Sequence, residues 1–585
     1  MRRYFEEEMR YLHEEGKVFA AKHPEQARFL NIDSISDRDP YVERLFEGFA
    51  FLAGRIHERL DDELPEYTEG FFSLLYPHFL RPIPALSIVE FSPKAGQVSE
   101  PTVLQRGTEI SSAPVGSEHV ACRFETTEDV IIRPLSLESA SLSLEADTTH
   151  SVALRFRVNS GARIEPEALE SVRLFFRADA GVASTMHLFF TRHVERVSIH
   201  SDDASEPASS VTLSGQRWIR AGGFGPDEGL LPYSEYTFSG TRLLQEYLNF
   251  RQRFWCIDLL GLDQLCGLDG DQTITVNVKF DRDYPEDRRF TDDNFRLHCC
   301  PVINLYESDA EPIRMSQTEA EYRVTANSNY RNSLEVYDVL RVVGIEEKTG
   351  RRHDYEPFYS FERGANGSNR FFIQSFRRGP DDQRTTYLSL SDGQEATQSV
   401  DSEVLSIDVR VTNGSLPREA LQENTINELG PDVPAIVDPA NLIQPTLIRY
   451  APTGDYGDYF WQLLSHLSLN RASLASTKEL AELLRLYDWS MSDANRRRIQ
   501  GIRDVRWEGK DIAVRGSVVR GGQVTIELEQ DHFADEGDIC LFGMVMSEFL
   551  SMYATINSFV HLKIITKPSE RTYEWKPNRG TRAGL

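Results

Sequence analysis

Ser151-Val152-Ala153-Leu154-Arg155-Phe156-Arg157-Val158 decides the fold of the largest part of this chain. Apolar side chains occupy every second position of this stretch, and a period of two is typical of a β-strand with one buried face. The turn residues Asn159-Ser160-Gly161 follow directly. Comparable strands are predicted at residues 87–91, 130–132, 172–176, 273–280 and 404–409. Residues 86–450 are therefore expected to be mainly β, with short helices such as one over residues 242–247.

Residues 1–85 carry a helical period instead. Apolar side chains recur there at spacings of three and four residues in two stretches, with charged residues between them. Asp39-Pro40 supplies an N-cap followed by proline at the first position of the second predicted helix. Two long helices and a short third form a thin domain, so either a partner protein or the rest of the chain must cover their apolar faces. The sequence leaves both alternatives open.

The C-terminal part combines both periods. Helices are predicted at residues 460–467, 477–486 and 543–553, and strands at 505–507, 524–528 and 561–565. Arg520-Gly521-Gly522 is expected to form a turn before the second of these strands. The predicted fold class is thus α+β and multidomain. Its parts are an N-terminal helical (core-bundle) segment at 1–85, a mainly-β domain at 86–300, a second β-rich domain at 301–450 and a C-terminal α+β domain at 451–585.

Composition and charge restrict the class of protein. The 585 residues carry a formal net charge of −27, which argues against nucleic acid and anionic membranes, because binding phosphate requires basic surface. The chain begins with a glutamate run in place of the apolar segment of a signal peptide. No apolar run approaches the roughly 18–20 residues that span a bilayer. Six cysteines in so long a chain do not form a disulfide framework, so we expect a cytoplasmic protein.

Two groups of residues invite a chemical interpretation. Asp61-Asp62-Glu63 with Glu66 is the densest carboxylate cluster near a helix boundary, and paired carboxylates serve glycosidases or hold hard metals. Acidic side chains are also favoured there by the dipole of the following helix, which is the preferred explanation. His298-Cys299-Cys300, with Cys256 and Cys266 upstream, suggests zinc. Adjacent cysteines of a strand point to opposite faces and the chain has no C-x-x-C pair, so buried free thiols are preferred.

The remaining motifs do not indicate chemistry. Gly222-Gly223-Phe224-Gly225 lacks the spacing and the lysine of a phosphate-binding loop and is predicted to be a turn. The sequence has no G-x-S-x-G elbow and no H-E-x-x-H helix. Polar residues of other motifs are expected to satisfy buried backbone groups or to cap helices; these are Arg55, His78, His466 and Asn470. The sequence therefore predicts no catalytic residue, no cofactor and no metal site.

Four stretches, in order along the chain, together resemble one family. They are Phe49-Ala50-Phe51-Leu52-Ala53-Gly54-Arg55-Ile56 with the continuation to Pro82, Cys300-Pro301-Val302-Ile303-Asn304-Leu305-Tyr306 with Tyr322-Arg323-Val324 and Glu335-Val336-Tyr337, Trp461-Gln462-Leu463-Leu464-Ser465-His466-Leu467-Ser468-Leu469-Asn470, and Arg520-Gly521 with Leu541-Phe542-Gly543 and Tyr553-Ala554-Thr555-Ile556-Asn557-Ser558-Phe559. The chain resembles the TssF (VasA/ImpG) family of type VI secretion baseplate proteins over essentially its whole length.

The resemblance implies a structural, non-enzymatic baseplate wedge of a contractile, phage-tail-like injection system. Two copies of TssF pair with one TssG, and this trimer binds TssK, which docks on the membrane complex at the cytoplasmic face of the inner membrane. The wedges surround the VgrG spike and contact neighbouring wedges, and TssE and the sheath subunits build upon them. Contact with the membrane is therefore only indirect.

The helical stripes of residues 1–85 fit such a role, because helices from several chains form a core bundle in similar wedge proteins. The residues predicted to face partner helices are Phe5, Met9, Leu12, Phe19, Leu45, Phe49, Leu52 and Ile56. The sequence has two alternative functions to be compared with this one. A β-rich carbohydrate-active enzyme would need two carboxylates converging in a cleft. A secreted binding module is disfavoured by the N-terminal sequence and the few cysteines.

Overall fold

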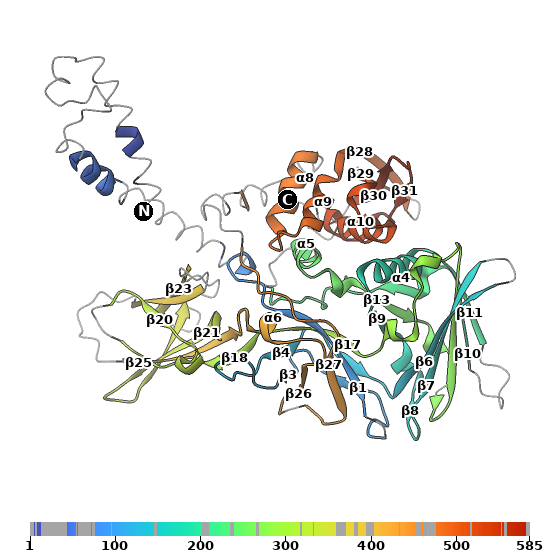
Figure 1. Ribbon diagram of the computed structural model, residues 1–585, viewed down its shortest axis with the longest axis horizontal. Helices are drawn as coiled ribbons and strands as arrows, with labels where there is room; N and C mark the ends of the chain where they lie inside the picture. The colour runs from blue at the N-terminus through green and yellow to red at the C-terminus, as the bar shows by residue number, and fades with distance from the viewer. Residues whose placement is uncertain are drawn as a thin grey trace, which may run out of the picture. The chain divides into compact units, whose positions relative to one another are not determined.

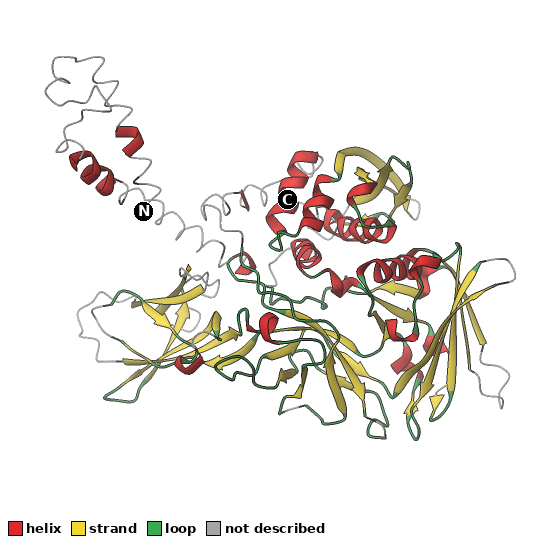
Figure 2. Cartoon of the chain, viewed as in Figure 1, coloured by secondary structure: helices red, strands yellow, loops and turns green. Residues whose placement is uncertain are grey.

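The computed structural model describes most of residues 77–580 and a few positions before them. The gaps lie at 95, 146–148, 202–209, 234–238, 265–267, 316–318, 331–332, 359–369, 379–383, 393–402, 432, 452–458, 460–461, 464–475, 515–516, 552 and 555–557, and the earlier described positions are 5, 9–12, 44–53, 55 and 72. The chain forms two compact units. One comprises Met1–Tyr76 with Thr453–Ser465, and the other comprises Pro77–Pro452 with His466–Leu585. Strands dominate the second unit (Figure 2).

A six-stranded sheet lies near the middle of the larger unit (Figure 1). Its strands, in spatial order, are β26 (Ile426–Leu429), β3 (Glu109–Ser112), β4 (Arg123–Thr126), β17 (Cys299–Ile303), β1 (Leu86–Pro93) and β27 (Val437–Asn441). β1 is buried at its first four positions, and it pairs with β17 along one edge and with β27 along the other. Segments more than 300 residues apart in sequence, β1 and β27, are thus hydrogen-bonded neighbours.

The opening stretch of the sequence lies in a five-stranded sheet. Its order is β11 (Ser210–Ser214), β10 (Val194–Ser201), β15 (Thr273–Phe280), β7 (His150–Val158) and β6 (Leu135–Leu144). In β7 the side chains of Leu154, Phe156 and Val158 are fully buried while the residues between them are not, as the period of two predicts. A two-stranded pair of β8 (Arg163–Ile164) and β14 (Leu268–Asp269) lies at its end.

A helix that the sequence did not predict covers a four-stranded sheet. The sheet has the order β12 (Ile219–Ala221), β13 (Cys256–Leu260), β9 (Ser171–Phe176) and β16 (Phe295–Arg296). Helix α4 (Ala180–Arg192) lies over it (Figure 1) and buries eight consecutive residues. Phe190 on α4 packs edge-to-face against Phe280 and Phe295. Because α4 is enclosed on every side, its apolar residues show no stripe that periodicity could detect.

The largest sheet has eight strands and its own apolar core. Its order is β18 (Tyr306–Asp309), β25 (Glu403–Thr412), β21 (Glu335–Glu346), β22 (Arg352–Pro357), β23 (Arg370–Arg378), β24 (Arg384–Asp392) and β20 (Tyr322–Val324), with β19 (Ile313–Arg314) paired to β25. Val342, Leu388 and Val409 are fully buried in this core. Asn304, at the end of β17, donates to the carbonyl of Arg123 and accepts from the backbone of Asn413. It thereby ties this sheet to the six-stranded one.

The C-terminal part forms an α+β module. A sheet of β28 (Ile502–Val514), β29 (Ser517–Glu529), β30 (Phe559–Lys567), β31 (Thr572–Glu574) and β32 (Asn578–Arg579) packs with helices α8 (Thr477–Tyr487), α9 (Asp493–Gln500) and α10 (Glu536–Ser551). α10 also contacts α4 and α5 (Ser239–Asn249). The predicted helix at 477–486 and strand at 561–565 are confirmed.

One local prediction in this module was wrong. Arg520-Gly521-Gly522 is not a turn but part of β29, with Gly521 opposite Lys510 and Gly522 opposite Gly509 on β28. The pairing of β28 with β29 continues beyond these glycines to Val514 and Ser517. The glycines serve packing instead, because a Cβ at Gly522 would meet the indole of Trp507 and one at Gly521 would meet Phe559. The fold class itself is confirmed as α+β, mostly strand and multidomain.

Candidate functional site

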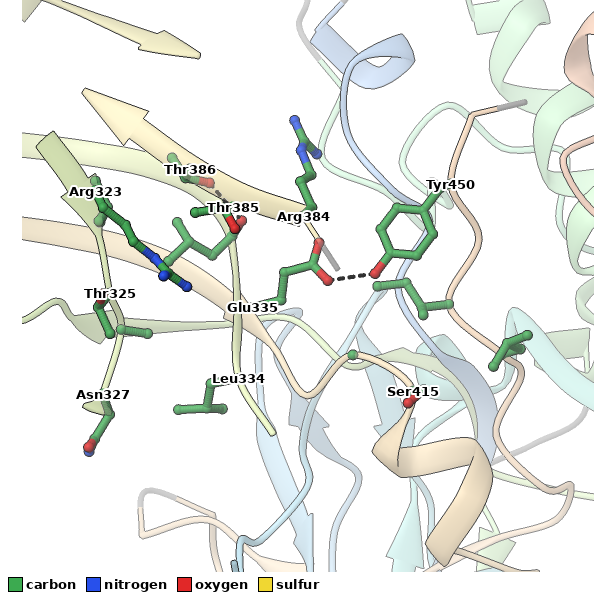
Figure 3. Close-up of a pocket in the computed structure, with 16 residues that line it drawn as sticks. Arg323, Thr325, Asn327, Leu334, Glu335, Arg384, Thr385, Thr386, Ser415 and Tyr450 are labelled. Atoms are coloured by element: carbon green, nitrogen blue, oxygen red, sulfur yellow. Dashed lines mark hydrogen bonds between the residues drawn. The ribbon is translucent and has the colours of Figure 1, made fainter. Parts of the chain in front are cut away.

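A cavity of about 340 Å³ opens at one end of the eight-stranded sheet (Figure 3). Its walls come from five segments: β20 and the loop after it, the start of β21, the start of β24, Gly414 with Ser415, and residues 447–450. Arg323, Thr325 and Asn327 line one side. Leu334 and Leu447 add apolar surface. The cavity therefore combines donors with apolar side chains, as ligand sites do, and its volume lies at the small end of their range, about 300–1,000 Å³.

Glu335 and Arg384, which both line this cavity, each contact a neighbouring aromatic side chain. The hydroxyl of Tyr450 donates to Glu335 Oε2 over 2.5 Å, which holds the 447–450 segment against the sheet (Figure 3). The guanidinium of Arg384 lies over the ring of Phe376 at 3.2 Å from its centroid. Thr386 donates to the carbonyl of Val336 over 3.3 Å, joining β24 to β21 behind the cavity.

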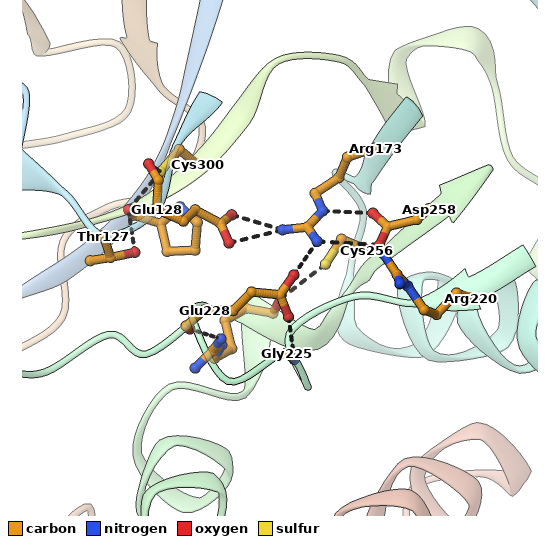
Figure 4. A network of polar contacts seen from close by, with 11 residues as sticks. Thr127, Glu128, Arg173, Arg220, Gly225, Glu228, Cys256, Asp258 and Cys300 are labelled. Atoms are coloured by element: carbon orange, nitrogen blue, oxygen red, sulfur yellow. Dashed lines mark hydrogen bonds and ion pairs between the residues drawn. The ribbon is translucent and has the colours of Figure 1, made fainter. Parts of the chain in front are cut away.

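A second polar group surrounds Arg173 on β9, where three carboxylates converge (Figure 4). Arg173 Nη1 donates to both oxygens of Glu128 at 2.9 Å, and Nε donates to Asp258 Oδ1 at 2.8 Å. Nη2 donates to Glu228 and, over 3.3 Å, to Asp258 Oδ2. Arg220 completes the group by donating to Asp258 Oδ2 over 2.9 Å. One guanidinium thus joins β9 and β13 to the loop after β4 and to the loop that carries Glu228.

The glycine-rich segment Gly222-Gly223-Phe224-Gly225 positions Glu228. It is a bend, as the sequence predicts, and the Gly225 backbone donates to Glu228 Oε2 over 2.6 Å. Gly223 has a φ of +90°, and a Cβ at Gly222 would lie 2.5 Å from Cys256 Sγ. A side chain at Gly222 would therefore push the loop away from β13, and with it the carboxylate that Arg173 binds.

Burial and ion pairing compete in setting the pKa values of these carboxyl groups. Burial would raise the pKa of Asp258, but hydrogen bonds from Arg173 and Arg220 outweigh it, and the pKa lies below its ordinary value. Glu228 behaves in the same way, with burial outweighed by Arg173. For Glu128 burial dominates and raises the pKa, although Arg173 offsets part of the effect. The ion pairs stabilise the charged forms of Asp258 and Glu228.

The geometry of these carboxylates can be compared with that of a glycoside hydrolase, the alternative function considered from the sequence. Such an enzyme needs two carboxyl groups that face a sugar from opposite sides, with space between them for the bond that breaks. Here the carboxylates converge, but the guanidinium of Arg173 fills the space between Glu128 and Asp258. The group is therefore an ion-pair network that fixes four segments, and its members are spread over 130 residues of sequence. No spacing pattern could have revealed it.

A third group could in principle hold a metal ion. Ligand atoms of Glu346, His353 and Glu403 lie within 4.8 Å of one another. Glu403 is buried and accepts from Arg370 Nη1 over 2.6 Å and from the Tyr355 hydroxyl over 3.0 Å. Both carboxylate oxygens thus have donors, and Arg370 supplies the positive charge that a metal ion would otherwise bring. The donor set does not fit a metal site.

The cysteines confirm the interpretation as buried thiols. Cys256, Cys299 and Cys300 are buried and free, as are Cys122 and Cys540, while Cys266 lies outside the described residues. Cys299 Sγ donates to the carbonyl of Leu297 and Cys300 Sγ to that of Pro301. His298 Nε2 accepts the backbone N–H of Arg133, so its ring also has a structural partner. The carboxylates at 61–66 lie outside the described residues.

Comparison with known proteins identifies the family to which this chain belongs. The family model for "Type VI secretion system, TssF" matches residues 1–582. The chain belongs to the TssF family. It is similar to the type VI secretion system component TssF1 of Pseudomonas aeruginosa, with 27% identity over 100% of this chain and 99% of that protein. As a member of this family it is a structural component of the type VI secretion baseplate.

Two solved structures agree with this assignment. A chain of the type VI secretion system TssK-TssF-TssG baseplate subcomplex, determined by cryo-electron microscopy, is 32% identical with a TM-score of 0.77, covering 92% of this chain and 99% of its own length. A chain of the baseplate complex from the type VI secretion system is 30% identical with a TM-score of 0.66, covering all of both chains. In the described part of this TssF-family chain, no helix has the length and apolar character needed to cross a bilayer.

Two polar residues of the TssF-like stretches, His78 and Arg81, have packing or ionic partners. His78 is buried against the rings of Phe79 and Tyr233, and burial lowers its pKa to about 3. Arg81 forms an ion pair with Asp338 at 2.7 Å and lies over the ring of Tyr337. Arg55 is exposed, and His466 and Asn470 lie outside the described residues.

The predicted interface residues fall in the smaller unit. Residues 44–53 are helical, and Leu45, Phe49 and Leu52 follow each other at spacings of four and three on one face. Their side chains are 71%, 61% and 60% exposed. Phe5, Met9 and Leu12 are helical and half-buried, while Phe19 and Ile56 lie outside the described residues.

Proposed function

We propose that this TssF-family chain acts as a wedge subunit, two copies of which bind one TssG through the helices of residues 1–85. The observation that carries the proposal is the exposed apolar face of Leu45, Phe49 and Leu52. Large apolar side chains at that exposure and on one helix face are typical of a surface that a partner covers. The likeness to the chain in a TssK-TssF-TssG subcomplex supports TssG and TssK as partners.

The finer assignments rest on family membership. They are a core bundle formed by the N-terminal helices, contacts with TssE, the VgrG spike, sheath subunits and neighbouring wedges, and a cytoplasmic location docked at the inner-membrane complex. The division into parts at 1–85, 86–300, 301–450 and 451–585 is likewise proposed. A purely structural role without catalysis is supported by the Arg173 and Glu403 groups, whose carboxylates are engaged with arginine.

The test replaces Leu45 and Phe49 together by aspartate in the full chain and measures co-purification with TssG. We expect loss of TssG from the complex, because two buried charges at an apolar interface are costly. Val518→Asp is the matched control, since Val518 is also 71% exposed but lies on β29 in the larger unit. TssG retained by a folded double variant would contradict the proposal. So would loss of TssG from the control alone.

A further inference from the structure

Two of the stretches that carry the family resemblance meet at the cavity beside the eight-stranded sheet. Tyr322-Arg323-Val324 forms β20, and Glu335-Val336-Tyr337 begins β21. Residues of both stretches line the cavity together with Ile448 and Tyr450 (Figure 3). Residues 325–334 lie between the two strands in sequence, and the fold brings both strands to the wall of this cavity.

One arginine of this cavity carries a positive charge that faces its interior. The guanidinium of Arg323 points into the cavity (Figure 3), while that of Arg384, which also belongs to the lining, lies over the ring of Phe376. Among the described residues that line the cavity Glu335 is the one acidic side chain, and it already accepts a hydrogen bond from the Tyr450 hydroxyl. Within the described residues no carboxylate forms an ion pair with Arg323, which is exposed. An exposed guanidinium that points into a cavity and has no carboxylate partner favours an anionic group.

The apolar part of the cavity decides what kind of anion fits. Leu447 is 46% exposed, and Leu334 and Ile448 also line the cavity. A free inorganic anion would leave this apolar surface in water, whereas a peptide with an apolar residue next to an acidic one would cover it. Thr325 and Asn327 supply hydroxyl and amide groups at the same rim, which suit a peptide backbone.

We propose that the cavity receives an aspartate or glutamate side chain, flanked by an apolar residue, from a protein subunit bound to this chain in the baseplate. Arg323 binds the carboxylate, and Leu334, Leu447 and Ile448 contact the apolar neighbour. The inference rests on the proposed function in one respect only, namely that this chain binds other subunits. It adds a contact in the larger unit, in addition to the helical face of residues 44–53.

The test uses the full chain in a purified complex with TssG and TssK. A photo-crosslinking amino acid, p-benzoylphenylalanine, replaces Leu447, and mass spectrometry identifies the crosslinked peptide after irradiation. We expect a peptide of a partner subunit with an acidic residue within about three positions of the crosslink. Arg323→Glu should lower the crosslink yield about tenfold, because like charges face each other across the contact. Arg323→Gln should give an intermediate yield.

Arg352→Glu is the control, since Arg352 is an exposed arginine on β22 of the same sheet and does not line the cavity. Its yield should equal that of the unchanged chain. Assembly is measured by gel filtration before irradiation. Three results would overturn the inference alone. They are assembly without a crosslink, a crosslink to a peptide that has no acidic residue, and equal yields for Arg323→Glu and Arg352→Glu. A chain that binds neither TssG nor TssK would contradict the proposed function and the inference with it.

Discussion

Arg173 and Asp258 face each other across the pairing of β9 with β13, and Arg173 Nε donates to Asp258 Oδ1 over 2.8 Å. The side chain of Asp258 is 2% exposed, so its charge is almost fully removed from water. A buried carboxylate is tolerated only where donors compensate it, and here two arginines do so. The strand register that places these two residues opposite each other therefore determines whether the network forms.

Replacing Asp258 by alanine should destabilise the larger unit. Arg173 keeps Glu128 and Glu228 as partners, but the buried pair is broken, and we expect a loss of about 3 kcal/mol in the free energy of unfolding. Urea unfolding followed by circular dichroism measures it. Asp263→Ala is the control, since Asp263 is exposed just after β13. Equal stability of the two variants would show that the network contributes nothing.

A pair of glycines on the β28–β29 hairpin gives a second test. Gly509 and Gly522 are paired across the strands, yet a Cβ at Gly522 would meet the Trp507 indole, whereas one at Gly509 meets nothing within 4 Å. Gly522→Ala should cost about 1–3 kcal/mol by overpacking. Gly509→Ala should be neutral or stabilising by up to about 1 kcal/mol. The melting temperatures of the two variants measure the difference, and a reversed order would contradict the packing described.

The same hairpin shows what sequence can and cannot predict. Alternation in residues 151–158 and 273–280 predicted β7 and β15 correctly, because each has one buried face. Gly521-Gly522 looked like a turn because glycine is common in turns, while the actual cause, two aromatic side chains lying over the backbone, is a tertiary contact. Helix α4 was missed because it is buried all round. The Arg173 network depends on strand register, which no local pattern contains.

Buried histidines should make stability depend on pH. Burial, with a smaller contribution from Arg251, lowers the pKa of His187 to about 4, against about 6.5 in the unfolded chain. As the pH falls below 6.5 the unfolded chain binds a proton that the folded chain does not, so stability is lost toward pH 4. At pH 5 this one group accounts for about 2 kcal/mol.

His187→Leu should therefore lose less stability between pH 7.5 and pH 5 than the unchanged chain, by about 2 kcal/mol. Urea unfolding at the two pH values gives the difference. His119→Asn serves as the control because His119 is exposed, and asparagine tolerates its φ of 52°. A pH dependence of His187→Leu as steep as that of the control would show that His187 is protonated in the folded state.

The rate at which the cysteine thiols are alkylated tests whether they are buried and whether they bind zinc. Burial raises the pKa of Cys122, Cys256 and Cys540 to about 12, although hydrogen bonding to Ser112 or nearby arginines offset part of the effect. The thiolate is the reactive form, so alkylation of these groups by iodoacetamide at pH 8 should be about a thousandfold slower than in the unfolded chain. Mass spectrometry quantifies alkylation at each cysteine.

Zinc ligation would also protect thiols, and a chelator separates the two causes. Cys299 and Cys300 are buried on β17 and donate to backbone carbonyls, so their protection should be the same with and without EDTA. A structural zinc site would lose its metal, and its cysteines would then react faster. Labelling in guanidinium chloride, where the chain is unfolded, confirms that each thiol is free to react. Faster alkylation of Cys299 or Cys300 after EDTA treatment would contradict the assignment as buried free thiols.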